Sequence, residues 1–301
     1  MISRSISSFA LVEIDLPKYD APLVTENGMN RRNFLRTMIY GSASIPLSAA
    51  CYGMFEAGWV AIERETVVMP RLPVGFQGFR IAFLTDLHHG PYTDLDYVQQ
   101  IVRTTNLLDP DLIVLGGDYS LRDPKYIAPC FDLLAGLRSR HGVYGVLGNH
   151  DYWQGIDETK KGMKAAKIIE LTNTGVWLEQ KSDRLRLAGV DDLWEGKPAL
   201  ETAIDGIRPD ERAIVVSHNP DYAETILDQR VGLVLSGHTH GGQVVFPGEN
   251  APFTPTQYGR KYLRGLCQAP ETQVYVSRGL GTVVAPIRFG SRPEISVLTL
   301  A

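Results

Sequence analysis

Most histidines of this chain stand in short segments that also contain aspartate, asparagine or glycine. The segments are Asp86-Leu87-His88, Gly117-Asp118, Gly148-Asn149-His150-Asp151, Ser217-His218-Asn219 and Gly237-His238-Thr239-His240. Imidazole nitrogens suit ions such as zinc, iron and manganese, whereas carboxylate and amide oxygens suit harder ions. Because none of the segments contains cysteine, a structural zinc site is not expected. The residue types therefore predict a metal site with mixed nitrogen and oxygen ligands.

Seven side chains in these segments are candidate ligands, a number more natural for two ions than for one, provided that one carboxylate bridges the ions. They are Asp86, His88, Asp118, Asn149, His218, His238 and His240. Each segment alone is weak evidence, because a Gly-Asp pair usually marks a turn. A single histidine at the end of a strand is also more often structural than a ligand. The five segments together, in this order, indicate a site.

Each of the five segments follows a short run of apolar residues, directly or after one intervening residue. The runs are Ile81–Leu84, Leu112–Leu115, Val143–Leu147, Ala213–Val216 and Val231–Leu235. They are rich in Val, Ile and Leu and apolar on both faces, a pattern typical of strands buried within a sheet. In layered α/β folds, sites form at the carboxyl ends of such strands. We therefore expect the candidate ligands to meet at one sheet edge.

Helical patterns separate these predicted strands. We expect helices over 95–108, 127–137, 157–170 and 221–229, and further strands at Gln243–Phe246, Gln273–Ser277 and Ile295–Leu300. Strands that alternate with helices favour an α/β layered core. No internal repeat or linker is apparent, so the sequence predicts one catalytic domain over residues 79–301.

The overall composition excludes several classes of protein. The chain has 301 residues, 44% of them hydrophobic and 21% charged, which is typical of a globular protein and not of a disordered one. A net charge of −4 gives no sign of the basic surface that binds nucleic acid. Three cysteines are too few for a disulfide scaffold. Whether Cys130 and Cys267 pair after export stays open.

The N-terminal region resembles an export signal. Arg31-Arg32 precedes Phe34-Leu35, and an uncharged stretch of 19 residues, Thr37–Phe55, follows with small residues near its end. This order matches a twin-arginine signal. We expect residues 29–62 to be this signal or a membrane anchor, cleaved or retained. The alternative is a cytoplasmic protein whose N-terminal helix packs on the core.

The signal begins unusually far from the start of the chain. Met29 stands directly before it, so our hypothesis is that Met29 is the true start. Residues 1–28 would then be a non-native leader or a disordered tail.

The series from Asp86-x-His88 to Gly237-His238-x-His240 resembles the calcineurin-like metallophosphoesterases, over about residues 79–301. The segments Thr85–Gly90, His218–Asp221 and Gly237–Gln243 are further similar to a branch of exported, membrane-associated phosphodiesterases with a twin-arginine signal. That branch is similar to enzymes that cleave the pyrophosphate of UDP-2,3-diacylglucosamine. The resemblance implies a four-layer αββα sandwich with two divalent ions, which would be manganese, iron or zinc.

Carried over residue by residue, the resemblance implies a role for each candidate. Asp86, His88 and His240 would hold one ion, Asn149, His218 and His238 the other, and Asp118 would bridge them. His150 would contact the phosphate and stabilise the transition state or protonate the leaving group. A hydroxide that bridges the ions would attack the phosphorus.

These features predict a dinuclear phosphohydrolase, in the first place a phosphodiesterase or pyrophosphohydrolase for an envelope lipid or a nucleotide conjugate. A phosphomonoesterase or nucleotidase, or a non-catalytic metal-bearing scaffold, is the alternative. The expected partners are a phosphoester substrate, the twin-arginine export machinery and the membrane, without nucleic acid. The expected location is the periplasm or the outer face of the cytoplasmic membrane.

Several polar residues near the segments keep more than one interpretation. Asp151 either orients His150 or, slightly favoured, caps the segment that follows. His89 either touches substrate or is merely polar. The pair Asp191-Asp192 is read as a solvated turn in preference to a carboxylate near the site. The basic loop with Arg260, Lys261 and Arg264 either binds substrate or is solvated.

Overall fold

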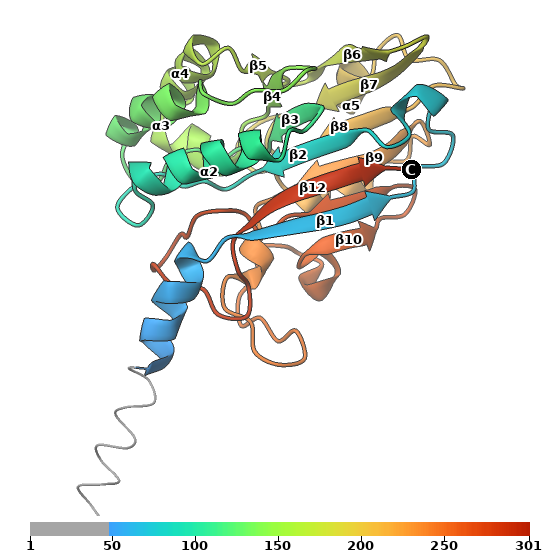
Figure 1. Cartoon of the computed structure of the whole chain (residues 1–301). Helices are drawn as coiled ribbons and strands as arrows, with labels where there is room; N and C mark the ends of the chain where they lie inside the picture. Colours follow the sequence, from blue (N-terminus) through green and yellow to red (C-terminus); the bar gives the residue numbers. More distant parts are fainter. Residues whose placement is uncertain (1–47) are drawn as a thin grey trace, which may run out of the picture. The chain divides into compact units, whose positions relative to one another are not determined.

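The computed structural model describes residues 48–301 (Figure 1). The twin-arginine pair Arg31-Arg32, the expected leader 1–28 and Met29 lie outside the described residues. The same holds for most of the uncharged stretch, of which only residues 48–55 are described. Those predictions stay predictions.

The first of two six-stranded sheets contains three of the predicted strands that precede candidate ligands. Its order is β1-β12-β2-β3-β4-β5, with β2 to β5 parallel and β12 antiparallel to β2. The bounds are β1 (Ala61–Val67), β12 (Glu294–Leu300), β2 (Arg80–Leu84), β3 (Leu112–Leu115), β4 (Val143–Gly145) and β5 (Ile169–Glu170).

The second sheet contains the other two predicted strands. Its order is β10-β11-β9-β8-β7-β6, with β11, β9, β8 and β7 parallel and an antiparallel strand at each edge. The bounds are β10 (Gly265–Gln268), β11 (Gln273–Val276), β9 (Val231–Ser236), β8 (Ala213–Val216), β7 (Asp183–Gly189) and β6 (Thr174–Gln180).

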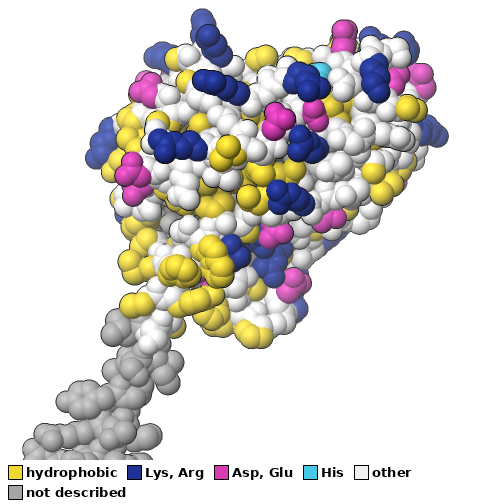
Figure 2. Space-filling view, viewed as in Figure 1, with side chains coloured by type: hydrophobic (Ala, Val, Ile, Leu, Met, Phe, Trp, Pro, Cys, Tyr) yellow, Lys and Arg dark blue, Asp and Glu magenta, His cyan; other side chains and the backbone are white. Residues whose placement is uncertain are grey.

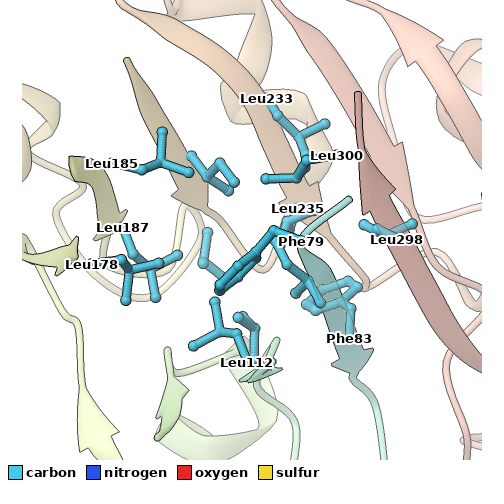
Figure 3. Close-up of a cluster of buried hydrophobic side chains, with 14 of the residues drawn as sticks. Phe79, Phe83, Leu112, Leu178, Leu185, Leu187, Leu233, Leu235, Leu298 and Leu300 are labelled. Atoms are coloured by element: carbon cyan, nitrogen blue, oxygen red, sulfur yellow. The ribbon is translucent and has the colours of Figure 1, made fainter. Parts of the chain in front are cut away.

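The two sheets pack face to face around an apolar core. Figure 3 shows side chains such as Phe83, Leu112, Leu187 and Leu235, from strands of both sheets, gathered in this interface. Burial of this area is the main force that holds the sheets together. Because the central strands are covered on both faces, their runs are apolar throughout, as the sequence predicts.

Helices cover the outer faces and complete four layers, so the predicted αββα architecture is confirmed. Apolar side chains of α2 (Leu95–Leu107), α3 (Ile127–Leu134) and α4 (Asn149–Ala165) pack on the first sheet (Figure 1). The second sheet is covered by the short α5 (Leu200–Ala203) and the 3₁₀ helix η3 (Pro220–Thr225). Four further 3₁₀ turns are η1 (Val74–Phe76), η2 (Pro124–Tyr126), η4 (His240–Gly242) and η5 (Gly259–Tyr262).

Two predicted helices and two predicted strands differ from the structure. The strand expected at Gln243–Phe246 does not form, because Val244 and Phe246 make only isolated bridges, with Phe289 and Asn250 respectively. The helix expected over 157–170 begins at Asn149 and ends at Ala165, because Lys167 adopts a positive φ of 58° that stops it. Ile169–Glu170 instead forms β5. The segment expected to be helical over 221–229 is a 3₁₀ helix that ends at Thr225. The strand expected to reach Leu147 ends at Gly145.

The sheet extends ahead of residue 79, where the sequence patterns place the start of the catalytic domain. All seven residues of β1 pair in parallel with β12. Before β1, residues 48–58 form a helix. None of the helices within the described part of the chain is long and apolar enough to cross a bilayer.

Candidate metal centre

Loops from both sheets converge at the carboxyl ends of five parallel strands. The loops after β2, β3 and β4 bring Asp86, His88, Asp118 and Asn149 from the first sheet, and those after β8 and β9 bring His218, His238 and His240 from the second. All seven candidate ligands are at most 6% exposed. A buried set of this kind stays together only if its charges are compensated.

One group of potential ligand atoms forms around Asp86. The Nε2 atoms of His88 and His240 lie 3.1 Å apart, and Asp86 Oδ1 is 3.9 Å from the first and 3.4 Å from the second. Three ligand atoms from these residues lie within 4.8 Å of one another, which is close enough to share one ion. The structure therefore brings together the three residues expected to hold the first ion.

Asp118 lies between this group and the residues expected to hold the second ion. Its Oδ2 is 3.5 Å from His88 Nε2 and 3.3 Å from His218 Nε2. The backbone N–H of His150 donates to its Oδ1 at 2.8 Å. The carboxylate thus faces both sides, the geometry that a bridging ligand needs.

The remaining two candidates are His238, which contacts His218, and Asn149. The Nδ1 atom of His238 is 3.2 Å from His218 Nε2, while His218 Nδ1 contacts the carbonyl of Gly116 at 2.8 Å. His238 Nε2 and Asn149 Oδ1 are buried and have no hydrogen-bond partner among the described residues. Such orphaned polar atoms are costly, and a bound cation near them would remove that cost.

The backbone at the site is held in unusual conformations. Asp86, His88, Asp118, His238 and His240 all have φ between 47° and 68°. Residues other than glycine rarely adopt this left-handed region, and each such residue stores strain. Strain of this kind concentrates at functional sites, and here it aims several side chains from adjacent turns at one point.

Two glycines allow the loops to approach so closely. A Cβ on Gly148 would overlap the Asp118 carboxylate and the ring of His218, and one on Gly237 would overlap Asp86 and Thr85. The Gly-Asn-His and Gly-His motifs therefore encode close packing as well as sharp turns.

Burial keeps three of the four candidate histidine ligands neutral. It lowers the pKa of His88 and of His238 to about 3, and that of His240 well below its ordinary value. Neutral imidazoles have free lone pairs, which metal ligation requires. His218 differs: burial acts to lower its pKa, but the charge of Asp118 and the hydrogen bond to it raise it well above the usual range.

The two carboxylates lack a nearby permanent cation. Burial raises the pKa of Asp86 to about 6. Burial also acts to raise the pKa of Asp118, but the charge and hydrogen bond of His218 hold it well below its usual value. Among the described residues, neither carboxylate pairs with a lysine or arginine. Together with the orphaned atoms, this donor set fits divalent cations.

His150 lies at the rim of the group and not inside it. It is partly buried, its Nδ1 has no partner among the described residues, and its ring packs edge-on against His88 at 4.7 Å and Trp153 at 4.6 Å. One of its nitrogens can also come within 4.8 Å of potential ligand atoms of His88 and Asp118. It is placed to reach a group bound between the cluster and solvent.

Asp151 caps the start of α4, as the sequence favoured. It also connects the loop after β4 to the loop after β3. Its Oδ2 accepts the N–H of Gly148, at the start of α4, and the N–H of Asp118, each at 2.8 Å, and its Oδ1 accepts that of Tyr119 at 3.0 Å. The carboxylate therefore fixes the position of Asp118 relative to the Asn149-His150 pair.

The interpretation of Asp192 as part of a solvated turn is wrong. Its side chain is buried, its Oδ1 accepts the N–H groups of Trp194 and Glu195 at 2.9 Å each, and its Oδ2 has no partner in the described structure. Trp194 packs edge-on against His238, with ring centroids 4.3 Å apart. The loop after β7 therefore contributes a wall of the site through Trp194.

Arg288 also belongs to the site, although no sequence motif indicates a role for it. Its fully buried guanidinium donates to the carbonyls of Gly281 at 2.6 Å, Arg278 at 2.8 Å, Ser291 at 2.9 Å and His240 at 3.3 Å. Its Nη2 also lies 3.4 Å from His240 Nδ1. Burial lowers its pKa to about 10, so it remains charged at neutral pH. No local pattern marks this arginine, because its role depends on how the loop 278–291 folds against His240.

Other polar candidates are used elsewhere. His89 is buried, and its Nδ1 contacts the carbonyl of Thr93 at 2.7 Å. In the basic loop, Lys261 pairs with Glu224. The two arginines of the loop, Arg260 and Arg264, donate to backbone carbonyls. None of these three residues lines the cleft that opens above the candidate metal centre.

All three cysteines are free. Cys130 packs among the α2, α3 and α4 side chains and Cys267 packs against the opposite outer layer, so the pairing left open by the sequence is absent.

A cleft of about 530 Å³ opens above the centre. Asp118, Asn149, His150, His238 and His240 line its polar end. Its walls are mostly apolar and include Trp153, Trp194, Val244, Phe253 and Val284. A ligand in this cleft would meet the polar cluster with one end and apolar side chains with the other.

Comparison with known proteins agrees with this geometry. The calcineurin-like phosphoesterase family matches residues 79–242. The uncharacterized metallophosphoesterase YkuE of Bacillus subtilis is 33% identical over 280 residues, 90% of this chain and 98% of YkuE. Phosphodiesterase YaeI of Escherichia coli is 31% identical over 278 residues, 90% of this chain and 99% of YaeI.

Among solved structures, Haemophilus influenzae NAD nucleotidase (NadN) aligns with a TM-score of 0.46 at 14% identity. That alignment covers 67% of this chain and 45% of the nucleotidase. The sequence matches cover the strands and loops that carry the cluster, and the chain is a metallophosphoesterase, a phosphoric ester hydrolase of the calcineurin-like phosphoesterase family.

Proposed function

We propose that this hydrolase is a dinuclear phosphodiesterase or pyrophosphohydrolase. The observation that carries the proposal is the buried cluster of carboxylates and neutral imidazoles around Asp118, at the polar end of an apolar cleft. The name of YaeI, a phosphodiesterase, supports the diester class. Two bound ions would neutralise the phosphoester and lower the pKa of a water molecule.

The proposed ligand sets follow the two groups of side chains. Asp86, His88 and His240 would hold the first ion, and Asn149, His218 and His238 the second. Asp118, with Oδ2 within 3.5 Å of nitrogens on both sides, would bridge them. The identity of the ions is left to metal analysis.

His150 would act on the phosphate from the solvent side of the centre. Its backbone N–H donates to Asp118, and its ring packs edge-on against Trp153. From there the imidazole can donate a hydrogen bond to a phosphate oxygen or a proton to the leaving group. General acid catalysis of this type contributes roughly 10²- to 10⁴-fold.

The walls of the cleft favour a substrate with an apolar part. A phosphate-bearing head would lie beside His150, and an acyl chain or similar group would lie along Phe253 and Val284. An envelope lipid phosphodiester has this division, and so does a nucleotide joined to a lipid.

The test compares two chromogenic substrates with the purified chain and Mn²⁺. Cleavage of bis-p-nitrophenyl phosphate in preference to p-nitrophenyl phosphate is expected. Preference for the monoester would replace the proposal by a phosphomonoesterase or nucleotidase. Absence of cleavage by protein that holds its metal would indicate a non-catalytic scaffold.

We also propose that the segment with Arg31-Arg32 directs export by the twin-arginine route. The support is the arginine pair followed by the uncharged stretch Thr37–Phe55. This route carries folded proteins, so the ions would be acquired before the membrane is crossed, and the enzyme would act in the periplasm or at the outer face of the cytoplasmic membrane. Replacing the pair by Lys-Lys should block export, and normal export of that variant would contradict the proposal.

A further inference from the structure

The helix of residues 48–58 exposes its large apolar side chains and buries an acidic one. Phe55 is 63% exposed, Met54 and the Trp59 that directly follows the helix are about half exposed, and Glu56 is 1% exposed. A helix on the surface of a water-soluble protein does the opposite, with its apolar face turned to the core. The orientation therefore needs a reason.

Polar contacts fix the helix in this orientation. Glu56 Oε1 accepts the backbone N–H of Ser291 at 2.9 Å, and the carbonyl of Gly53 accepts the N–H of Arg288 at 2.9 Å. Glu56 is thus held on the loop that also carries the Arg288 guanidinium. Reversing the helix would break these buried hydrogen bonds, so the outward apolar side chains are built into the fold.

The exposed apolar surface continues from this helix to the mouth of the cleft. Tyr52 packs on Phe289 at 5.7 Å, and Phe289 packs on Phe246 at 5.9 Å. Phe253 and Val284, which line the cleft, are 72% and 78% exposed. We call this surface the apolar collar; it consists of Met54, Phe55, Trp59, Phe246, Phe253 and Val284.

The figures show hydrophobic side chains at the end of the domain where helix 48–58 lies. Helix 48–58 (blue) lies beside loops of the C-terminal third of the chain (orange to red) in Figure 1. In Figure 2, hydrophobic side chains gather at the lower end of the described domain, while most charged side chains in that view lie above them. Contiguous exposed apolar patches of this kind mark interaction surfaces.

Charged and aromatic groups at the edge of the collar indicate which partner covers it. The Arg292 guanidinium lies 3.8 Å from the ring centroid of Trp59. Arg122 Nη2 donates to the hydroxyl of Tyr92, which donates to the carbonyl of Val284 at 3.4 Å. Tryptophan, tyrosine and arginine around an apolar patch are typical of the membrane interface, where the cations meet anionic head groups.

The sequence before the helix points in the same direction. The uncharged stretch Thr37–Phe55 runs directly into the collar and ends on one of its members. A second copy of the chain or a protein partner would not require such a stretch to lead into its contact surface.

We propose that the apolar collar rests on a lipid bilayer, with Phe55, Phe253 and Val284 inserted at the level of the head groups. Because the last two also line the cleft, the cleft opens onto the membrane surface. A phosphoester at that surface would enter without crossing water. This proposal is independent of the ester class that the enzyme cleaves.

The test measures the depth of single nitroxide labels on the full-length chain. Cys51 and Cys267 are replaced by serine, and labels are placed through Phe253→Cys and Val284→Cys. The matched control is Leu107→Cys. Leu107 is 85% exposed, and it stands at the end of α2, at the edge of the first sheet opposite to the collar. Folding of each variant is checked by circular dichroism.

Vesicles of phosphatidylethanolamine and phosphatidylglycerol are then added. At positions 253 and 284, oxygen accessibility should rise severalfold relative to that of a water-soluble nickel reagent, and position 107 should not change. Vesicles of phosphatidylcholine alone should give a smaller shift, since they lack anionic head groups.

Three results would overturn the proposal. Labels 253 and 284 that stay in water while the protein floats with the vesicles would mean that the chain is held by its N-terminal region alone. Short distances between labels of two copies without lipid would assign the collar to a dimer. The same shift at position 107 would mean that the domain lies on the membrane without a preferred face. Failure to cleave diesters would instead contradict only the proposed function.

Discussion

Both edges of the two sheets carry buried acidic side chains, but these are neutralised in different ways. At the amino-terminal ends of the strands, the acids pair with arginines: Glu211 lies 2.6 Å from Arg184 and 2.9 Å from Arg208. At the carboxyl ends, Asp86 and Asp118 face histidines instead. At the amino-terminal edge, protein side chains neutralise the acids. At the carboxyl edge, the acids lack enough positive charge from the protein.

This difference separates structure from chemistry within one fold. A guanidinium satisfies a carboxylate permanently, because it stays protonated at any physiological pH. The neutral imidazoles of His88, His238 and His240 offer lone pairs, and only His218 compensates part of the carboxylate charge. The carboxyl edge therefore gains stability only when it binds cations. The positive φ angles of five of the candidate ligands show that the backbone is strained at this edge.

The largest effect is expected from Asp118→Asn, which removes the charge between the two ligand groups. Both ions should be lost, and diester cleavage should fall by about 10⁴-fold, since each ion contributes several kcal/mol to the transition state. Metal content by mass spectrometry and turnover provide the measurements. Asp228→Asn, at the arginine-paired edge, is the control and should keep its metal. Retention of both ions by Asp118→Asn would refute the bridging role.

His150→Ala should reduce turnover by about 10²- to 10³-fold while the metal content stays unchanged. The reason is that His150 lies at the rim of the cluster and acts on the phosphate. Turnover and metal content are measured on the same preparation. If this variant lost an ion, His150 would have to be counted among the ligands, in line with its approach to His88 and Asp118.

Arg288→Lys should weaken metal binding by about 10- to 100-fold, the range found for groups that orient metal ligands. A lysine keeps the positive charge but cannot reach the four carbonyls that the guanidinium holds. Titration with Mn²⁺ followed by calorimetry measures the affinity. Arg292→Lys, at an exposed arginine of the same loop, should leave it unchanged. Equal affinities in the two variants would remove Arg288 from any role at the metal centre.

The smallest effect is expected at the opposite edge. Glu211→Gln should lower the free energy of unfolding by about 1–3 kcal/mol, the cost of charged hydrogen bonds, and leave turnover unchanged. Urea unfolding and diester cleavage are the two measurements. A loss of turnover in a folded Glu211→Gln protein would break the division between the two edges.

The same variant gives a pH dependence. Burial acts to raise the pKa of Glu211, but hydrogen bonds from Arg208 and Arg184 hold it below its usual value. Its stabilising effect is therefore present above the unfolded-state pKa of about 4.3 and is lost as the pH falls through the lower folded-state pKa. The difference in stability between the wild type and Glu211→Gln should shrink in that acid range.

The sequence determined the central strands and the order of the candidate ligands. Runs such as Leu112–Leu115 are apolar on both faces because each strand is covered by a sheet on one side and helices on the other. The motifs follow those runs directly or after one residue, so chain order alone brings them to the carboxyl edge. Helix bounds were less accurate, because the start of α4 depends on the Asp151 carboxylate, which also binds the neighbouring loop.

Only the tertiary structure decided the surroundings of the site. The contact of Arg288 with His240 and the outward apolar face of helix 48–58 depend on partners far away in the chain, such as the contact of Ser291 with Glu56. Local periodicity reports whether a segment is buried, but it does not report which distant carbonyl or carboxylate meets it. The ligand types were therefore legible in the sequence, whereas the groups that orient and surround them were not.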